Sequence, residues 1–479
     1  MINKGYERNY TNVVESKYGP RRNNLQDMQM TKHIEKPHLY SISKEERVDM
    51  TIYETYSIDP IGCKDADDAF SIYRESGKLF FAIHIADPTE YIKLHSELWD
   101  DIVHRTTTKY PSNREPIHMM PLQVLELSSL QGTEEGNIKN AITVLTEVNT
   151  SYEPVNEIKL LFTNVLVRKN NAVTYNDAAI IHDNGEETAI KNAIVTGLKI
   201  SECLKTRRTK KTKGVKLNEV NIAYPVYEDG RVFLQEDPEN VRLVKQMIAE
   251  FAIFANSFVG EYLKIHLNTG IFRTCAANAW LQTVYNDITG EQLLQEIITN
   301  GIRAEYMSNI ESHDLVGMPE YCHFTSPIRR LSDCICHYLL KYIYCKNRRT
   351  EHVYTTMPFT EQELDNLADR CLKVTRTDKK NQYLDIKFRL LQVMSNMILE
   401  NKTVQIQYYI TSYSGLFLNL IICQIDAFHV HMSYTLRVRG YAKEINPKEK
   451  HLLTITQVNC YTNYDESTIP ELDQQLLRQ

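Results

Sequence analysis

Four aspartates fall within ten residues near the start of the chain: Asp59, Asp65, Asp67 and Asp68, called here the aspartate cluster. Carboxylates this close repel one another, and Asp disfavours the strand that the following residues predict. A positive group should therefore compensate them. A solvated acidic loop is one interpretation. An EF-hand calcium loop is excluded, because the pattern lacks Gly at its sixth position and Glu at its twelfth.

A divalent-cation site for phosphoryl chemistry is the other interpretation of the aspartate cluster. Magnesium prefers hard oxygen ligands such as carboxylates. Two such ions, about 4 Å apart, can hold the attacking and leaving oxygens of an in-line displacement. The ions would offset the carboxylate repulsion and make the attacking water easier to deprotonate. The cluster therefore predicts either an acidic loop or a catalytic metal site.

A second segment, residues 321–340, combines a helix start with basic side chains. Ser326 can cap a helix and Pro327 can occupy its first position. Arg329 and Arg330 would then lie in the first turn, where the positive end of the helix favours phosphate oxygens. The sequence predicts an anion-binding helix start here.

Asp333 and His337 follow Arg329 at intervals of four residues. On a helix this spacing places all three side chains on one face. An ordinary capped helix with a surface ion pair remains the alternative for this segment taken alone.

Taken together, these segments resemble the hallmarks of the ribonuclease II / ribonuclease R (RNB) family. The motifs IDPIGCKDADDA and HFTSPIRR carry most of the resemblance, which spans about residues 45 to 395. The stretches that resemble the family, in the family's own order, are residues 57–70, 81–92, 106–121, 140–149, 173–178, 303–308 and 313–330.

The resemblance implies hydrolysis of single-stranded RNA from its 3′ end to nucleoside 5′-monophosphates. It implies one or two Mg²⁺ ions, which Mn²⁺ could replace, held by the aspartate cluster, with Asp67 and Asp68 acting in catalysis. Arg329 would contact the phosphate and stabilise the charge that develops in the transition state. Tyr110 would stack on the terminal base, with a half-buried structural tyrosine as the alternative.

Two positions depart from the family pattern. Leu331 stands where the family usually has an aromatic, and Thr375 stands where it often has a Glu that helps place the RNA 3′ end. A catalytically impaired RNA-binding protein of the family, acting as a regulator or a complex subunit, is therefore the second hypothesis. A nuclease for DNA, or a general phosphodiesterase with the same metals, is a more distant third.

Positive charge is concentrated in residues 205–216, with seven Lys or Arg in twelve residues. A solvated loop is the usual meaning of such a run, but phosphate contacts dominate the binding of single strands, so we expect it to follow the RNA backbone. Lys341, Lys346, Arg348 and Arg349 could extend this surface. The predicted RNA contacts are Tyr110, Arg329, Arg330, Lys210 and Lys211.

The pattern of elements predicts an α+β fold in three parts. Residues 1–44 are expected to form an extension, and residues 45–398 an RNB catalytic domain with a mixed β-sheet surrounded by helices. Residues 399–479 are expected to form an OB-fold-like β-barrel that binds RNA. The 44 residues before the first motif are too few for the two cold-shock barrels usual in the family, so protein partners could take their place.

Composition adds limits on the class of protein. The net charge of −6 does not by itself indicate a nucleic-acid partner. The ten cysteines show no metal-binding spacing, which favours free thiols in a reducing compartment. No apolar run reaches the roughly 18 residues of a membrane span, and the first residues do not resemble a signal peptide. We therefore expect a cytoplasmic protein with no membrane partner.

Overall fold

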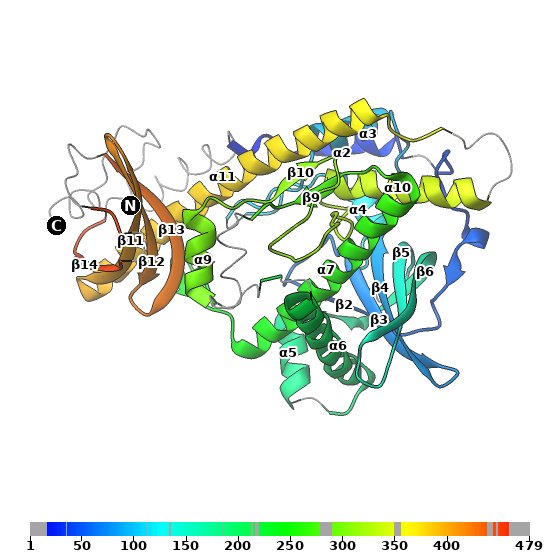
Figure 1. Ribbon diagram of the computed structural model, residues 1–479, viewed down its shortest axis with the longest axis horizontal. Coiled ribbons are helices and arrows are strands. Elements are labelled where there is room, and N and C mark those ends of the chain that lie inside the picture. Colours follow the sequence, from blue (N-terminus) through cyan, green and yellow to red (C-terminus); the bar gives the residue numbers. More distant parts are fainter. Residues whose placement is uncertain are drawn as a thin grey trace.

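The computed structural model describes residues 17–458, apart from 35, 113, 134–135, 185, 212–213, 216–219, 278–289, 349–355, 438–443 and 447–448. Its large sheet lies at one end of the molecule, a small sheet lies at the other, and the long helix α11 (Glu361–Asn401) connects the two parts (Figure 1). The predicted α+β class is confirmed.

The large sheet is mixed and closes on itself. Its strand order is β1-β6-β2-β3-β4-β5, and β6 also pairs with β5. The pairings of β6 with β1 and β2 are parallel, and the other pairings are antiparallel. The strands are β1 (Val48–Asp49), β2 (Thr55–Asp59), β3 (Asp68–Glu75), β4 (Lys78–Ala86), β5 (Ile138–Val148) and β6 (Pro154–Thr174).

Two strands precede the aspartate cluster, since a turn at residues 51–53 separates β1 from β2. After the cluster, β3 and β4 form a hairpin that pairs from Asp68↔Ile85 to Glu75↔Lys78. The aspartate cluster thus runs from the end of β2 to the start of β3.

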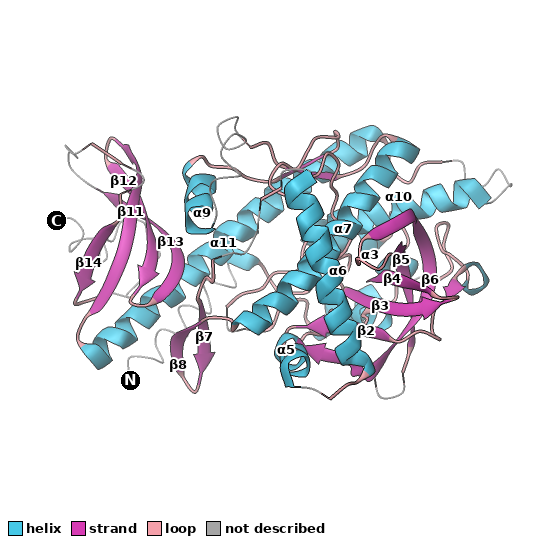
Figure 2. Ribbon diagram, turned by 60° about the horizontal axis from the view of Figure 1, so that its bottom comes forward, coloured by secondary structure: helices cyan, strands magenta, loops and turns pink. Residues whose placement is uncertain are grey.

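Helices cover the large sheet from several directions (Figure 1; Figure 2). Aromatic packing helps hold them, since Phe251 of α7 contacts Phe70 of β3 and Phe81 of β4 with ring centroids 5.5 and 4.6 Å apart. The helices of this part are α3 (Glu97–Arg105), α4 (Leu122–Ser128), α5 (Tyr175–Asn184), α6 (Ala189–Lys211), α7 (Glu239–Leu267) and α10 (Leu331–Arg348), whereas α9 (Gly290–Thr299) lies near the small sheet at the other end (Figure 1). A two-stranded sheet of β9 (Phe272–Thr274) and β10 (Glu305–Met307) completes the part around the large sheet.

The C-terminal sheet has a hydrophobic core of its own, separate from the core of the large sheet. This four-stranded antiparallel sheet has the order β13-β12-β11-β14. Its strands are β11 (Val404–Ser414), β12 (Phe417–Ile425), β13 (Phe428–Arg437) and β14 (His451–Ile455). The core also takes in the last turns of α11 and the hairpin of β7 (Tyr224–Glu228) and β8 (Arg231–Gln235), so a hairpin from the middle of the chain packs with the C-terminal sheet.

The residues before the large sheet are more ordered than the sequence indicated. Helix α2 (Asn24–Thr31) begins with a capping box between Asn23 and Gln26. Tyr18 and Ile42 are buried at 2% and 0% exposure, so this stretch packs on the rest of the fold. Among the described helices, none combines the length and the apolar character needed to span a membrane.

Candidate active site

The chain brings the aspartate cluster together at one end of the large sheet. Asp59 ends β2 and Asp68 begins β3, and the loop between these strands carries Asp65 and Asp67. Asp65 and Asp67 are buried, at 9% and 3% exposure, while Asp59 and Asp68 are half-buried. Four carboxylates are thus taken largely out of water within a few residues of one another.

Residues 321–330, which are distant in the sequence, contact this cluster. The Ile328 N–H donates to Asp67 Oδ1 at 2.8 Å, and Arg329 Nε donates to Asp67 Oδ2 at 3.0 Å. Arg329 Nη2 also donates to Ser326 Oγ at 2.9 Å. Although 262 residues separate the partners, the two predicted segments form one site. Arg329 therefore supplies one positive group beside the cluster, in addition to the metal ions expected from the sequence.

Electrostatics show that one arginine does not compensate all four carboxylates. Burial raises the pKa of Asp67 well above its ordinary value, although Arg329 and the Ile328 N–H oppose this. Burial, with repulsion from Asp59, raises the pKa of Asp68 to about 7. Burial also raises the pKa of Asp59. Raised values for neighbouring carboxylates mark a site that favours additional positive charge.

Three side chains surround Asp65. The Tyr110 hydroxyl donates to Asp65 Oδ2 at 3.2 Å, and His118 Nδ1 lies 3.9 Å from the same oxygen. The Cys63 Sγ lies 3.6 Å from Asp65 Oδ1 and 3.8 Å from Asp59 Oδ1. The hydroxyl of Ser57 donates to Asp59. The sequence carries no signal for Ser57, Cys63 or His118, since only their placement beside the carboxylates distinguishes them.

The predicted helix start at Ser326 is wrong. Helix α10 begins at Leu331, and residues 327–329 form a turn. The cause is that the backbone donors of this segment bond carboxylates instead of entering a helix: the Ser326 N–H donates to Asp333 Oδ1 at 2.8 Å, and the Ile328 N–H donates to Asp67. The turn, not a helix terminus, presents Arg329 to the cluster.

Arg330 and Asp333 form a fork of two hydrogen bonds, Nε to Oδ2 at 2.9 Å and Nη2 to Oδ1 at 2.8 Å. The Asp333 carboxylate is fully buried. Because Asp333 also accepts from the Ser326 N–H, this pair fastens the turn to α10. The contact of Arg330 with RNA stays a prediction.

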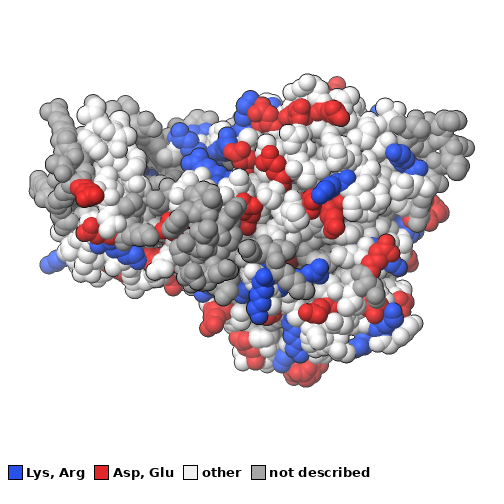
Figure 3. All heavy atoms as spheres, in the orientation of Figure 1, with Lys and Arg blue, Asp and Glu red and all other residues white. Residues whose placement is uncertain are grey.

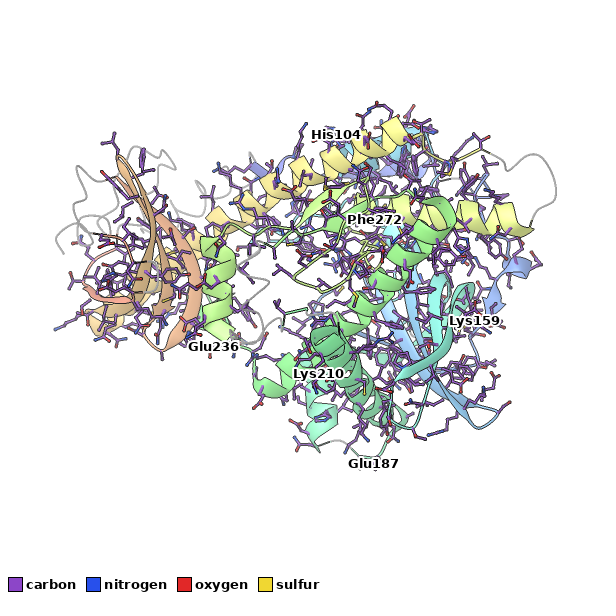
Figure 4. The ribbon with its side chains drawn as sticks, viewed as in Figure 1. His104, Lys159, Glu187, Lys210, Glu236 and Phe272 are labelled. Carbon is purple, nitrogen blue, oxygen red and sulfur yellow. The ribbon has the colours of Figure 1, made fainter. Side chains whose placement is uncertain are left out.

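The predicted basic surface is only partly a surface. Residues 205–211 form the last turns of α6. Arg208 is buried at 1% exposure and pairs with Glu250 at 2.7 Å. Lys210 is exposed on α6, and Figure 4 shows it well apart from His104 of α3. The side chain of Lys211 lies outside the described residues.

Lys341 was predicted to extend the RNA surface, and this is wrong. Its side chain is fully buried and its Nζ lies 2.9 Å from Asp87 Oδ1 and 3.0 Å from Glu90 Oε2. Arg47 Nη2 joins the same two carboxylates at 2.7 and 2.8 Å. A buried charge must be paired, and this network of four groups ties α10 to the end of β4. Basic and acidic side chains are interspersed over the face in Figure 3.

The donor chemistry of the aspartate cluster fits a divalent cation. No hydrogen bond or ion pair to the Asp68 carboxylate is found in the described part of the chain, and this group is repelled by Asp59. As arranged, however, the described residues contain no group of three or more His, Cys, Asp or Glu side chains placed to hold a metal ion. The Ile328 N–H and Arg329 bond both oxygens of Asp67, so binding a cation there requires Arg329 to adjust, whereas Tyr110 bonds only Oδ2 of Asp65.

Comparisons with known proteins agree with this geometry. Residues 47–346 match the model of the RNB domain. This chain belongs to the RNB family. It is similar to the exosome complex exonuclease dis3 of Schizosaccharomyces pombe, with 26% identity over 328 residues that cover 59% of this chain and 32% of the relative. It is also similar to ribonuclease R of Helicobacter pylori, with 24% identity over 396 residues that cover 73% of this chain and 57% of the relative.

Solved structures show the same fold. Ribonuclease R of Mycoplasma genitalium, in complex with ribose-methylated single-stranded RNA, matches with a TM-score of 0.68 and 16% identity over 90% of this chain and 75% of that chain. Yeast Ssd1, described as a pseudonuclease, matches with a TM-score of 0.62 and 14% identity over 88% of this chain and 56% of that chain. The chain spans about a third to just over half of the length of the curated relatives above.

Proposed function

We propose that this chain is a Mg²⁺-dependent 3′→5′ exoribonuclease that hydrolyses single-stranded RNA to nucleoside 5′-monophosphates. The observation that carries the proposal is the contact of Arg329 Nε with Asp67 Oδ2 at 3.0 Å, which joins the two motifs into one anionic site with Arg329 at its edge. The membership of residues 47–346 in the RNB family supports it.

The aspartate cluster would hold one or two Mg²⁺ ions, with Mn²⁺ as a substitute. When bound, such ions lower the pKa of water and neutralise charge on the phosphate. Asp67 and Asp68 would orient the attacking water. The water oxygen forms a bond to phosphorus, the bond from phosphorus to the 3′ oxygen of the preceding nucleotide breaks, and that oxygen takes up a proton. The products are a nucleoside 5′-monophosphate and an RNA shorter by one residue.

Arg329 is placed to meet the phosphate. Its side chain is 44% exposed although its Nε is bonded to the buried Asp67, so its free edge faces solvent at the site. A guanidinium there would stabilise the charge that develops on the phosphate oxygens. Tyr110, 40% exposed, presents a ring at the same site and would stack on the terminal base. Lys210 and Lys211 would contact the RNA backbone farther along α6.

The same data support proposals for place and partners. Every cysteine in the described ranges is free, which suits a reducing, intracellular compartment. Relatives named as exosome complex exonucleases make a protein assembly a reasonable setting for this chain. We propose RNA as the substrate and protein partners as additional contacts for it.

A catalytically impaired RNA-binding protein is the second candidate. The observation that favours it is the engagement of both Asp67 oxygens by Arg329 and the Ile328 N–H, in a cluster with no ready group of three metal ligands among the described residues. The likeness to Ssd1 shows that this fold also occurs in a pseudonuclease.

A gel time course with 5′-labelled single-stranded RNA separates the two candidates. Wild type, Asp67→Asn and the matched control Asp229→Asn, in the exposed turn between β7 and β8, are each compared with Mg²⁺ and with EDTA. We expect a shortening ladder that requires Mg²⁺, persists in Asp229→Asn and vanishes in Asp67→Asn. RNA that is shifted in mobility but intact in every lane would exclude the enzyme and support the RNA-binding protein.

A further inference from the structure

A stretch before the large sheet is fastened to the loop that carries Tyr110. This stretch, the 17–22 segment, lies against residues 109–119, called the 109–119 loop, of which residue 113 is outside the description. Contacts from side chains to carbonyl oxygens join them, among them Lys109 Nζ to Tyr18 O at 2.8 Å, Arg21 Nη1 to Pro116 O at 2.8 Å, and Arg22 Nη1 to His118 O at 3.1 Å.

Arg22 is the most buried of these connections. Its side chain is 6% exposed, and its Nε donates to Asp101 Oδ2 of α3 at 3.0 Å. Its guanidinium also donates to the carbonyl oxygens of His118 and Met119. The planar fork of an arginine holds donors for one carboxylate and two carbonyls in fixed, separated positions, a geometry that the compact ammonium of a lysine does not reproduce. Arg22 therefore clamps the end of the 109–119 loop to α3.

Tyr18 holds the other end of the segment on α11. It is 2% exposed, and its hydroxyl lies 3.5 Å from Asp385 Oδ2. Asn381 Nδ2 donates to the carbonyl oxygen of Lys17 at 3.0 Å. The Ser112 N–H, from the 109–119 loop, donates to the same Asp385 oxygen at 2.6 Å. The segment and the loop thus share an anchor on α11.

The far side of the 109–119 loop faces the aspartate cluster. Tyr110 and His118, near the two ends of the loop, both approach Asp65 Oδ2, at 3.2 and 3.9 Å. Lys109 and Ile117 exchange two backbone hydrogen bonds, at 3.1 and 2.8 Å, so the two ends of the loop are tied to each other. A displacement of His118 should therefore also displace Tyr110. Because both side chains lie next to Asp65, the position of its carboxylate should change with them.

We propose that Arg22 is a positioning residue for the aspartate cluster: the 17–22 segment sets the 109–119 loop, and the loop sets Asp65 for cation binding. This inference rests on the proposed function, since it assigns a control on that same site. Partners that orient a ligating carboxylate commonly change metal affinity by about 10- to 100-fold when they are removed. A ligand or partner that moves the 17–22 segment would change the metal affinity of the site.

The first test measures Mn²⁺ binding by titration calorimetry, in the absence of RNA, on the full chain. Tyr110→Phe should weaken Mn²⁺ binding about tenfold by removing the hydroxyl from Asp65. Arg22→Ala should weaken it about three- to tenfold. The double variant Arg22→Ala/Tyr110→Phe should bind Mn²⁺ only slightly more weakly than Tyr110→Phe alone. The reason is that both substitutions act through the hydrogen bond from Tyr110 to Asp65. Arg168→Ala, which removes an exposed pair with Glu54, serves as the control and should bind as wild type does.

Two results would overturn the inference: wild-type Mn²⁺ affinity in Arg22→Ala, or losses that multiply in the double variant. Should Arg22→Ala fail to fold, Arg22→Lys takes its place. It keeps the pair with Asp101 but not both carbonyl contacts, and a two- to threefold loss is expected, with wild-type affinity counting against the inference.

Hydrogen exchange gives a second measurement that does not depend on the metal. The amides of Lys109 and Ile117 should exchange faster in Arg22→Ala than in wild type, with Arg168→Ala unchanged. Unaltered exchange would contradict the coupling between segment and loop. The proposed function fails if wild type binds no Mn²⁺, or if Asp67→Asn binds Mn²⁺ as tightly as wild type does. In that case the hydrogen-exchange measurement alone decides whether Arg22 positions the loop.

Discussion

Replacing Arg329 by Met tests the electrostatic part of the mechanism. Arg329 lies at the edge of the site, with its side chain 44% exposed, and bonds the buried Asp67. A donor aimed at charge that develops in the transition state contributes about 2–4 kcal/mol, so the rate of hydrolysis under single turnover should fall about 30- to 1,000-fold. A pair with one exposed partner contributes at most about 1 kcal/mol to the free energy of unfolding. The expected signature is a large loss of rate with little loss of stability.

The pH dependence of the rate should also shift in a predictable direction. Arg329 lowers the pKa of Asp67 against the effect of burial, so its removal raises that pKa further. The rising limb of the rate against pH should therefore move to higher pH in Arg329→Met. Rapid-quench kinetics with labelled RNA measure the rate, and urea denaturation measures stability, with Arg168→Met as the control. A loss of rate below threefold, or a limb that moves to lower pH, would refute the reasoning.

Three further predictions concern stability and metal. Lys341→Met should lower the free energy of unfolding in urea by about 3–5 kcal/mol because Asp87 and Glu90 lose a buried partner, whereas exposed Lys346→Met should change it by no more than about 0.5 kcal/mol. Burial raises the pKa of Asp378 and of Asp385 to about 6, so each contributes stability below pH 4 that is lost as the pH rises toward 6. About 3 kcal/mol each should disappear between pH 4 and 7, and a flat urea profile would contradict this. EDTA should abolish RNA hydrolysis while leaving the circular dichroism spectrum unchanged, and loss of the spectrum would instead make the metal a structural element.

The fold and the membership of the aspartate cluster could be predicted from the sequence for a physical reason. Alternation and turn residues specify the β3–β4 hairpin locally, and four carboxylates in ten residues are unusual enough to require a charged partner. The compensating charge was predicted to be a metal ion, and Arg329 was predicted only as a phosphate contact; its bond to Asp67 came from the structure. These inferences depend on residues close together in the sequence.

The positions that were missed depend on contacts between distant residues. Ser326 and Pro327 suit a helix start, but the Ile328 N–H bonds Asp67, and this tertiary bond moves the start of α10 to Leu331. From the sequence alone, Lys341 is expected to be a surface charge. The structure instead places it beside the buried Asp87. The role proposed for Arg22 likewise depends on carbonyl groups of a loop almost 100 residues away, which carry no signal in side-chain type.

The most direct test of the central claim is product analysis in water enriched in ¹⁸O. Wild type and Asp67→Asn are incubated with single-stranded RNA and Mg²⁺, and the released nucleotides are examined by mass spectrometry. The account predicts nucleoside 5′-monophosphates that carry one ¹⁸O on the phosphate from wild type, and none from Asp67→Asn. Cyclic phosphates or 3′-monophosphates, unlabelled products, or equal release by both proteins would contradict hydrolysis at the aspartate cluster.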